Sequence, residues 1–503
     1  MRTTLYCISL VLSIYMLIGC FSKHENNWPQ FRGTNSLGIA SENATPPLEL
    51  NPDKNLAWKI PLARGLSSPC IFDGRIFLTG FNPKDSALIT YCINLNKGSF
   101  LWERSAFPDT LEKVHQYLGS PATPTPVTDG TLVYVYFGTY GVLCYDTKGN
   151  LLWERRLPIL NAQYGSNGSP VIHDSLLIIN RVERKKPSIL ALNKVNGKTV
   201  WQRYLDLAAG SPELMDISQS TPVIWRDQII IHHGFELISL NLNDGNVKWI
   251  IEMVSTGNAT PIIINDTLFV NGWYNVGHPS QFDSIPDFDL MIGKYDANHD
   301  KLINIQKEIP LELALFKRPE INLPLSGDTL YPLKWFAGGY DSNKDNSLEE
   351  KEWNQMKKDW FDYLLDHAVI ALKLYPEVES GQPVLIWKQK DYVAEVPSLV
   401  GIRSRIYMVM NGGNLICIDS KTGSVIFKDR LKAPGSYLSS PMYANGYIYF
   451  TSYNGRITVV KPGDKLNIIA QSDLQEKISA SPAAIGKFLY IRTDSALYAF
   501  KKL

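Results

Sequence analysis

Apolar and polar residues alternate in short runs along most of the chain, and one arrangement of these runs recurs. Each copy has an alternating run, then Asp or Asn, a Gly shortly afterwards, and a second run that closes on a large aromatic residue. The alternation indicates strands, and Asp or Asn with a nearby Gly indicates a tight turn between them. The copies are INLNKGSFLW at 93–102, VLCYDTKGNLLW at 142–153, ILALNKVNGKTVW at 189–201, LISLNLNDGNVKW at 237–249 and LICIDSKTGSVIF at 415–427.

The spacing of the copies predicts the fold. Trp102, Trp153, Trp201 and Trp249 follow one another at intervals of 51, 48 and 48 residues, which suits the roughly 40–50 residues of a four-stranded propeller blade. A second marker, a residue followed by Pro, precedes each copy, where the missing N–H of Pro costs nothing at the start of a strand. We therefore expect an all-β, eight-bladed β-propeller. The markers are Ser68-Pro69, Thr125-Pro126, Ser169-Pro170, Thr221-Pro222, Thr260-Pro261, Val396-Pro397, Ser440-Pro441 and Ser481-Pro482.

Two fragments near opposite ends of the chain complete one another. NLAWK at 55–59 is a closing strand with its Trp but without a unit before it. SALYAF at 495–500 is an alternating run without a turn or Trp after it. We expect the strand near residues 55–60 to join the last blade, which closes the ring and leaves no open sheet edge.

The first twenty residues predict a signal peptide. Arg2 precedes an apolar run that ends in Leu17-Ile18-Gly19-Cys20 and is short for a bilayer span. The Leu, Gly and Cys resemble a bacterial lipoprotein signal, in which Cys20 would be lipidated; an ordinary cleaved signal is the alternative. Residues 21–27 would then be a tether and residues 28–276 the first part of the propeller. We expect a lipid-anchored protein of the bacterial cell envelope, at the outer membrane, facing the periplasm or the surface.

Charge and cysteine content argue against several classes of function. The chain has 50 Lys and Arg against 49 Asp and Glu, so no bulk positive field is available for nucleic acid. Cys92, Cys144 and Cys417 fall inside predicted strands, where Cys is usually a small buried apolar residue. The sequence has no CxxC, CxxCH or adjacent Cys pair, which disfavours thiol redox, zinc and c-type haem sites.

One blade is interrupted between its second strand, within 260–274, and its third, at 368–372. The apolar period there changes from two to helical, which predicts a helical insertion over 277–366, with the propeller resuming at 367–503. One predicted apolar face has Phe288, Met291, Ile292 and Tyr295, and another has Trp353, Met356, Trp360 and Leu364.

The insertion contains an EF-hand sequence at 341–352, DSNKDNSLEEKE. The predicted Ca²⁺ ligands follow the EF-hand spacing of hard oxygen donors, with the backbone carbonyl of Ser347 at position 7 and a water-bridging Glu349 at position 9. Asn346 replaces the usual Gly at position 6 and tolerates positive φ. A polar helix–loop–helix without metal is the alternative. The ligands are Asp341, Asn343, Asp345, Ser347, Glu349 and Glu352.

A second, weaker loop precedes it. Asp296, Asn298 and Asp300 fit the first three ligand positions. Position 12 is Lys307, however, and Glu308 comes one residue late. Either the loop bulges by one residue so that Glu308 becomes a ligand, or this hand is a degenerate partner of the other. Both possibilities stay open at this stage.

Other candidate residues map to one rim of the predicted propeller. Links between second and third strands emerge there together with the links between blades, so the insertion is expected on the same rim. Histidines, tyrosines and the basic run RVERKK at 181–186 suit an anionic or sugar-like ligand; the alternative is a satisfied histidine pair and solvated charges. The rim residues are His115, Tyr117, Tyr140, Tyr164, Asn167, Arg181, His232 and His233.

Several stretches resemble the bacterial PQQ-binding-like β-propeller repeat proteins, relatives of quinoprotein dehydrogenases and of the assembly lipoprotein BamB. The resemblance implies an eight-bladed quinoprotein-like propeller; many members of this group are thought to bind no quinone. This chain departs from the pattern at Phe427, which replaces Trp, and at 457–470, where no Trp follows the turn. The stretches are NWPQFRGTNSLGIA at 27–40, NLAWKIPL at 55–62, SPATPTPVTDGTLVYVYFGTYGVLCYD at 120–146 and QYGSNGSP at 163–170.

Three functions are compatible with these features. A binding module for an envelope protein or glycan, with Ca²⁺ stiffening the insertion, is favoured because the sequence has no GxSxG, HExxH or Walker motif. A PQQ-dependent oxidoreductase is the enzymatic alternative, but the adjacent-cysteine ring and haem attachment site of such enzymes are missing, so PQQ is not expected. A BamB-like role in outer-membrane protein assembly is the third.

Overall fold

The computed structural model of the chain describes residues 27–503, except 113, 115–118, 161, 163, 183–185, 206–218, 235, 254, 274–277, 318–329 and 376–380. The predicted signal peptide and Cys20 lie outside the described residues. Within the described part, no helix is both long and apolar enough to cross a bilayer.

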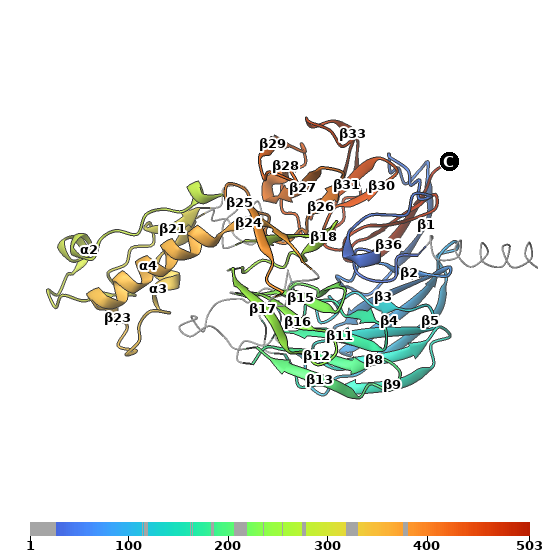
Figure 1. Cartoon of the computed structure of the whole chain (residues 1–503), viewed down its shortest axis with the longest axis horizontal. Coiled ribbons are helices and arrows are strands. Elements are labelled where there is room, and N and C mark those ends of the chain that lie inside the picture. Colours follow the sequence, from blue (N-terminus) through green and yellow to red (C-terminus); the bar gives the residue numbers. More distant parts are fainter. Residues whose placement is uncertain are drawn as a thin grey trace, which may run out of the picture.

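Eight four-stranded antiparallel sheets form a β-propeller, which confirms the predicted fold class (Figure 1). In blades 1–7 the chain runs from the first, innermost strand to the fourth, outermost one, whereas the outermost strand of blade 8 comes from the N-terminal part of the chain. The strands of blades 1–4 are β2 (Cys70–Phe72), β3 (Arg75–Asn82), β4 (Ala87–Asn94), β5 (Phe100–Ala106); β6 (Val127–Thr128), β7 (Leu132–Phe137), β8 (Gly141–Asp146), β9 (Leu151–Arg156); β10 (Val171–His173), β11 (Leu176–Arg181), β12 (Ser188–Asn193), β13 (Thr199–Tyr204); and β14 (Val223–Trp225), β15 (Gln228–His233), β16 (Glu236–Asn241), β17 (Val247–Glu252). Those of blades 5–8 are β18 (Ile262–Ile264), β19 (Thr267–Gly272), β24 (Ala368–Lys373), β25 (Val384–Gln389); β26 (Val400–Ile402), β27 (Arg405–Met410), β28 (Asn414–Asp419), β29 (Val425–Arg430); β30 (Met442–Ala444), β31 (Tyr447–Thr451), β32 (Arg456–Val460), β33 (Ile468–Asp473); and β34 (Ala483–Ile485), β35 (Phe488–Arg492), β36 (Ala496–Lys501), β1 (Leu56–Pro61).

The repeated Trp and Gly dock one blade on the next. The ring of an outermost-strand Trp lies directly under the Gly of the following blade's last turn, so that a Cβ added to this Gly would meet the ring at 2.5–2.7 Å. The indole N–H of most of these Trp residues donates to a carbonyl oxygen in the same turn, at 3.0–3.1 Å. Only a residue without Cβ and at ease with positive φ fits there. The pairs are Trp58–Gly98, Trp102–Gly149, Trp153–Gly197, Trp201–Gly245 and Trp387–Gly423.

The cysteines of the strands belong to the same packing. Cys92, Cys144 and Cys417 lie opposite Trp102, Trp153 and Phe427 on the neighbouring strand. All three are buried with free thiols. They occupy the position where other blades have Ala or Ser opposite the Trp, so their role is that of small buried residues.

A closed belt of hydrogen bonds runs around the innermost strands. In each blade a buried Ser or Thr lies two residues before the first strand, and its backbone N–H donates to the hydroxyl of the equivalent residue in the next blade, at 2.9–3.3 Å. In blade 6 this residue is Ser398, which directly follows the predicted marker Val396-Pro397 and lies two residues before β26. The belt runs Ser68, Thr125, Ser169, Thr221, Thr260, Ser398, Ser440, Ser481 and back to Ser68.

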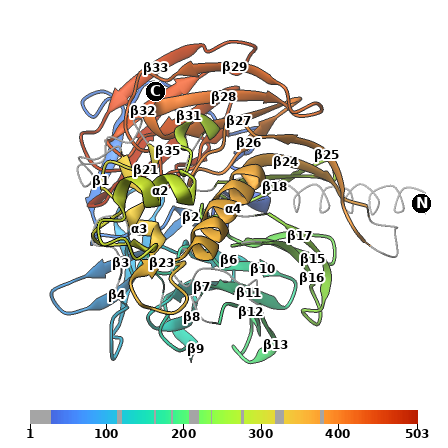
Figure 2. The same cartoon turned by 90° about the vertical axis from the view of Figure 1, so that its left-hand side faces the viewer.

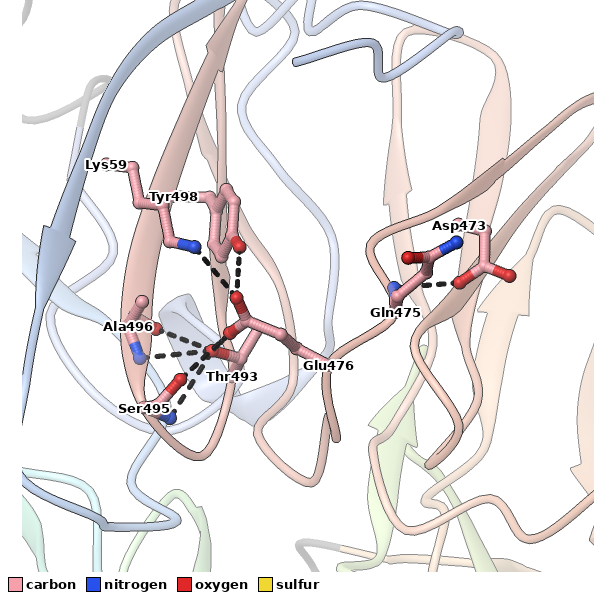
Figure 3. Close-up of polar contacts among 8 residues, drawn as sticks. All are labelled: Lys59, Asp473, Gln475, Glu476, Thr493, Ser495, Ala496 and Tyr498. Carbon is pink, nitrogen blue, oxygen red and sulfur yellow. Dashed lines mark hydrogen bonds and ion pairs between the residues drawn. The ribbon is translucent and has the colours of Figure 1, made fainter.

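The ring closes in blade 8, where β1 pairs antiparallel with β36. The carboxylate of Glu476 binds both strands and the turn between β35 and β36 (Figure 3). Its Oε1 accepts from Lys59 Nζ at 2.8 Å and from the Tyr498 hydroxyl, and its Oε2 accepts from the hydroxyls of Thr493 and Ser495. Burial raises the pKa of Glu476, but these four hydrogen bonds outweigh it and lower the pKa to about 2.

This lowered pKa predicts acid sensitivity at the closure. A carboxyl group with a depressed pKa in the folded state stabilises the fold above its ordinary pKa of 4.5, and this contribution is lost as the pH falls toward 2. We expect Glu476→Gln to lower the free energy of unfolding at pH 7 by about 1–2 kcal/mol and to flatten the loss of stability between pH 4.5 and 2. Urea unfolding at several pH values measures both; an acid limb identical to that of the wild type would contradict the prediction.

The N-terminal segment, residues 27–50, crosses the propeller on the face of the turns between first and second strands. It includes the short 3₁₀ helix η1 (Thr34–Ser36). Bridges pair Trp28 with Ile71 in blade 1 and Ile39 with Tyr443 in blade 7. The buried Arg32 guanidinium donates to Leu399 O in blade 6 at 2.6 Å. Blades distant in sequence are thus tied together on this face.

The insertion lies between β19 and β24 and has its own apolar core. Figure 1 shows it standing off one side of the propeller, and Figure 2 places its helices in front of the blades. Phe288, Met291, Trp353, Met356 and Trp360 are buried in this core; the side chain of Leu364 lies outside the described residues. Its elements are η2 (Pro279–Gln281), α2 (Phe288–Tyr295), β20 (Ile303–Asn304), β21 (Ala314–Lys317), β22 (Leu330–Pro332), α3 (Lys334–Ala337), β23 (Ser347–Leu348) and α4 (Glu350–Asp366).

The predicted pair of complete EF-hands is not confirmed, because the described residues contain only three helices in this region. The first loop follows α2 but leads into a turn, and Pro310 cannot continue a helix. The second loop follows the single turn α3, which ends at Gly338-Gly339, and leads into the long helix α4. The two loops are nevertheless joined by the two-residue β20–β23 pairing, Ile303 with Leu348 and Asn304 with Ser347.

Candidate functional site

The two faces of the propeller carry different additions. Each second strand begins at the turn from the first strand and ends on the opposite face. The N-terminal segment contacts these turns at Asp73 and Gly486, whereas the insertion leaves the propeller at the far end of β19. The rim that carries the insertion is therefore the face opposite the N-terminal segment.

The second loop of the insertion, Asp341–Glu352, folds its oxygen-bearing side chains back onto its own backbone. Asp341 Oδ2 accepts from Asn346 N at 2.8 Å, and Asp345 Oδ1 accepts from Ser347 N at 2.8 Å. Asn343 Oδ1 accepts from Asp345 N at 3.0 Å. These bonds fix the side chains of the first, third and fifth residues against the backbone of the loop.

Glu352 closes this loop from the first turn of α4. Its Oε1 accepts from the backbone N and the hydroxyl of Ser342, at 2.9 and 2.6 Å, and its Oε2 accepts from Glu349 N at 3.1 Å. Burial raises the pKa of Glu352, but the bonds to Ser342 and Glu349 prevail and lower it. The carboxylate is thus held ionised across the loop, at the position of the predicted bidentate ligand.

In the first loop, Asp296 and Glu308 also accept hydrogen bonds from the backbone of the loop. Asp296 Oδ2 accepts from Lys301 N at 3.0 Å, and Glu308 Oε1 accepts from Ala297 N at 3.0 Å. Across the described residues, no group of three or more His, Cys, Asp and Glu side chains is placed so that it could hold a metal ion. A cation in either loop would also need amide, backbone or water oxygens, which Ca²⁺ uses readily.

Two of the predicted rim histidines, His232 and His233, are buried instead of being presented to solvent. His232 is fully buried, and its Nε2 lies 2.9 Å from Met253 O, so this nitrogen carries the proton. Burial lowers the pKa of His232 to about 4, and burial together with His232 lowers that of His233 to about 4. Both are neutral at pH 7. His232 holds the segment after β17 in place through its hydrogen bond to Met253 O.

The other predicted rim residues that the structure describes have separate surroundings and different partners. The Tyr140 hydroxyl donates to Glu154 Oε2 at 2.7 Å, and the Arg156 guanidinium covers the Tyr140 ring. Asn167 N donates to Gln219 Oε1 at 2.8 Å, and Tyr164 is half-buried nearby in the chain. His115 and Tyr117 lie outside the described residues.

The structure adds a buried polar cluster that the sequence analysis missed. Glu112, in the link between blades 1 and 2, is buried with Thr139 and Arg181 beside it. Burial raises the pKa of Glu112 to about 7, although Thr139 and Arg181 oppose this rise. Both Glu112 oxygens and Arg181 Nη1 lack a hydrogen-bond partner among the described residues. No local pattern marks such a cluster, because its members come from the link between blades 1 and 2, a turn within blade 2 and the end of β11 in blade 3.

Comparison with known proteins agrees with this architecture. Residues 84–277 match the family model described as "Outer membrane protein assembly factor BamB". The match runs from β4 in blade 1 to just past β19 in blade 5 and agrees with the propeller fold. A search of the curated proteins returned no match.

Solved structures similar to this BamB-like propeller include BamB from Moraxella catarrhalis, at 11% identity, 89% of this chain, 99% of that chain and a TM-score of 0.54. A europium-containing methanol dehydrogenase covers 95% of this chain and 99% of its own at 10% identity, with a TM-score of 0.56. Quinohemoprotein alcohol dehydrogenase from Comamonas testosteroni covers 95% and 80% at 11% identity, with a TM-score of 0.51. At these identities the likeness establishes the fold.

The residues of the BamB-like propeller do not fit the PQQ site that the resemblance to quinoproteins suggests. The adjacent-cysteine ring of those enzymes has no counterpart in the sequence. The described cysteines are separate and buried, and Cys70 Sγ donates to Pro29 O in the N-terminal segment.

Proposed function

We propose that this chain is a calcium-binding, BamB-like scaffold of the bacterial cell envelope, lipid-anchored through Cys20, that binds a partner protein or glycan on the rim that carries the insertion. The observation behind the proposal is the arrangement of the second loop, Asp341–Glu352, on that rim. The BamB-like fold is consistent with an envelope location.

The donor chemistry of the second loop suits Ca²⁺. Carboxylates from Asp341, Asp345 and Glu352, the amide oxygen of Asn343 and the carbonyl of Ser347 are hard oxygen ligands. Ca²⁺ takes about six to eight such oxygens in loose geometry, and water completes many sites. The backbone of the loop is tightly turned, because Lys344 and Asn346 adopt φ of 62° and 66°. Repulsion between the carboxylates has therefore not extended the loop.

A binding role agrees with how the scaffold is built. The belt, the docked Trp residues and the closure hold the blades in one arrangement, so the links on the rim are carried by a rigid support. The insertion is attached to that support near its base, where the His278 ring packs on Tyr392 of the link between blades 5 and 6, with centroids 5.2 Å apart. Ca²⁺ bound in the insertion would order a surface next to the rim residues.

Calcium binding by the full chain tests the proposal. We expect Glu352→Gln to weaken Ca²⁺ binding at the second loop by at least about tenfold to hundredfold, because it removes a charged, two-oxygen ligand. Isothermal titration with CaCl₂ measures the effect. Glu350→Gln, which changes the same charge at an exposed neighbouring position, is the control and should bind as the wild type does. A wild-type chain that takes up no Ca²⁺ at millimolar concentration would overturn the proposal.

A second candidate function is assembly of outer-membrane proteins, as the name of the matching family model says of its members. The match over residues 84–277 favours it, since these residues run from the third strand of blade 1 through the second strand of blade 5. Co-purification with outer-membrane assembly proteins, unchanged after chelation of Ca²⁺, would favour this role over the calcium-dependent one.

A further inference from the structure

The first loop of the insertion, residues 296–308, shares backbone torsion angles with the second loop. Its fourth and sixth residues, His299 and Lys301, adopt φ of 59° and 64°. The fourth and sixth residues of the second loop, Lys344 and Asn346, adopt φ of 62° and 66°. Positive φ is unfavourable for Lys and His, so its occurrence at the same two positions of both loops indicates one shared loop conformation.

The acceptor bonds inside the two loops also correspond. Asp296 Oδ2 accepts from the N–H five residues later, that of Lys301, as Asp341 Oδ2 does from Asn346. Asp300 Oδ1 accepts from Leu302 N at 2.9 Å, as Asp345 Oδ1 does from Ser347 N. The first, third and fifth side chains of the first loop therefore accept hydrogen bonds from the same backbone positions as those of the second.

Glu308 makes the same backbone contacts as Glu352 of the second loop. Counted from the start of its loop, however, Glu308 is residue thirteen and Glu352 is residue twelve. Its Oε1 accepts from Ala297 N at 3.0 Å and its Oε2 from Asn304 N at 2.7 Å. Glu352 accepts from the same second and ninth loop positions. Lys307, which occupies position twelve by count, is exposed, whereas Glu308 is only 8% exposed. The extra residue is accommodated in the turn between Asn304 and Glu308.

One buried oxygen in the first loop has no partner. Asp296 is 7% exposed, and its Oδ1 accepts no hydrogen bond from any described residue. In the second loop the corresponding Asp341 Oδ1 accepts from Asp345 N at 3.2 Å. A desolvated carboxylate oxygen without a donor is unfavourable, and the other oxygen of Asp296 faces across the loop to Lys301 N. A cation inside the loop would satisfy Asp296 Oδ1.

We propose that Asp296–Glu308 is a second Ca²⁺ site with a thirteen-residue loop, in which Glu308 supplies the closing carboxylate in place of the residue at position twelve. This inference rests on the proposed function, since it assigns a second ion to the same insertion. Asp296, Asn298, Asp300 and Glu308 supply the side-chain oxygens. The insertion then holds two ions, one on each side of the buried Ile303–Leu348 pair.

The number of ions bound by the full chain tests this inference. Equilibrium dialysis with ⁴⁵Ca²⁺ is expected to give two ions per wild-type chain and one for Glu308→Gln, whose site weakens by at least about tenfold to hundredfold. Asp300→Asn changes an exposed residue and should also leave one bound ion. It shows that the loss in Glu308→Gln is not caused by misfolding around a buried substitution. Glu312→Gln, an exposed change of the same charge, and Lys307→Gln should both keep two.

Each other result has a distinct meaning. One ion in the wild type that survives Glu308→Gln and disappears in Glu352→Gln would overturn the second site and leave the proposed function standing. Two ions in both the wild type and Glu308→Gln would overturn the thirteen-residue loop. Loss of one ion in Lys307→Gln would do the same. A wild type without bound Ca²⁺ would overturn both proposals.

Discussion

Removal of the last seven residues, Leu497–Leu503, is expected to unfold the whole propeller, not merely to fray its end. These residues contain nearly all of β36, which pairs with β35 on one side and with β1 on the other. Leu497, Tyr498 and Phe500 are buried, and each large apolar side chain contributes about 1.5–3 kcal/mol through burial. Their sum approaches the total stability of an ordinary domain, about 5–15 kcal/mol.

The truncation also separates the two ends of the ring. Without β36, β1 has no partner in blade 8, and Trp58 can no longer be held on Gly98 of blade 1. Thermal unfolding followed by circular dichroism should show no cooperative transition for the truncated chain. Deletion of Lys502 and Leu503 alone is the control, because Leu503 is 91% exposed, and should melt with the wild type. A truncated protein with unchanged melting would contradict closure by β36.

Gly245→Ala is expected to destabilise the fold by about 2–5 kcal/mol. The added Cβ would lie 2.5 Å from Trp201 Cε3, and the residue has φ of +71°. Left-handed backbone costs a residue with Cβ about 1–2 kcal/mol, and overpacking against a ring that cannot withdraw adds about 1–3 kcal/mol. Trp201 is held by its own N–H, which donates to Leu242 O at 3.0 Å, so it cannot move aside cheaply.

Gly446→Ala separates these two effects. Gly446 also has positive φ, +86°, but a Cβ there would meet nothing within 4 Å. We expect it to lose only the backbone part, about 1–2 kcal/mol. Urea unfolding of both variants gives the difference, which measures the contact between blades at Trp201. Equal losses would mean that the Trp–Gly contact does not constrain the ring.

Much of the propeller is predictable from sequence because its signals are local. Alternation, the turn residues and the closing Trp all lie within one hairpin, so each copy can be recognised by itself. The burial of Cys92, Cys144 and Cys417 follows from the same pattern. The marker Val396-Pro397 precedes blade 6 as expected, but the Pro pattern did not reveal that the hydroxyl and N–H of the following Ser398 join the neighbouring blades.

The candidate site residues also divide into those that a short segment of sequence reveals and those that it does not. The ligand residues of the second loop are readable because an EF-hand loop is one continuous segment. The choice between a bulged and a degenerate first loop could not be made from spacing, since it depends on how Glu308 folds back onto Ala297 and Asn304. Helix content was overestimated in the insertion, where Pro310 and Gly338-Gly339 interrupt the helical pattern.

The sequence alone determined the repeat, its eight units, the partner strands at the two ends and the acidic loops, because each depends on the order of residues within a short segment. Only the tertiary structure decided that eight hydroxyls join in one belt, that His232 is buried and neutral, and that Glu112 and Arg181 lie together. Those outcomes depend on neighbours from other blades, which are brought into contact by the closing of the ring.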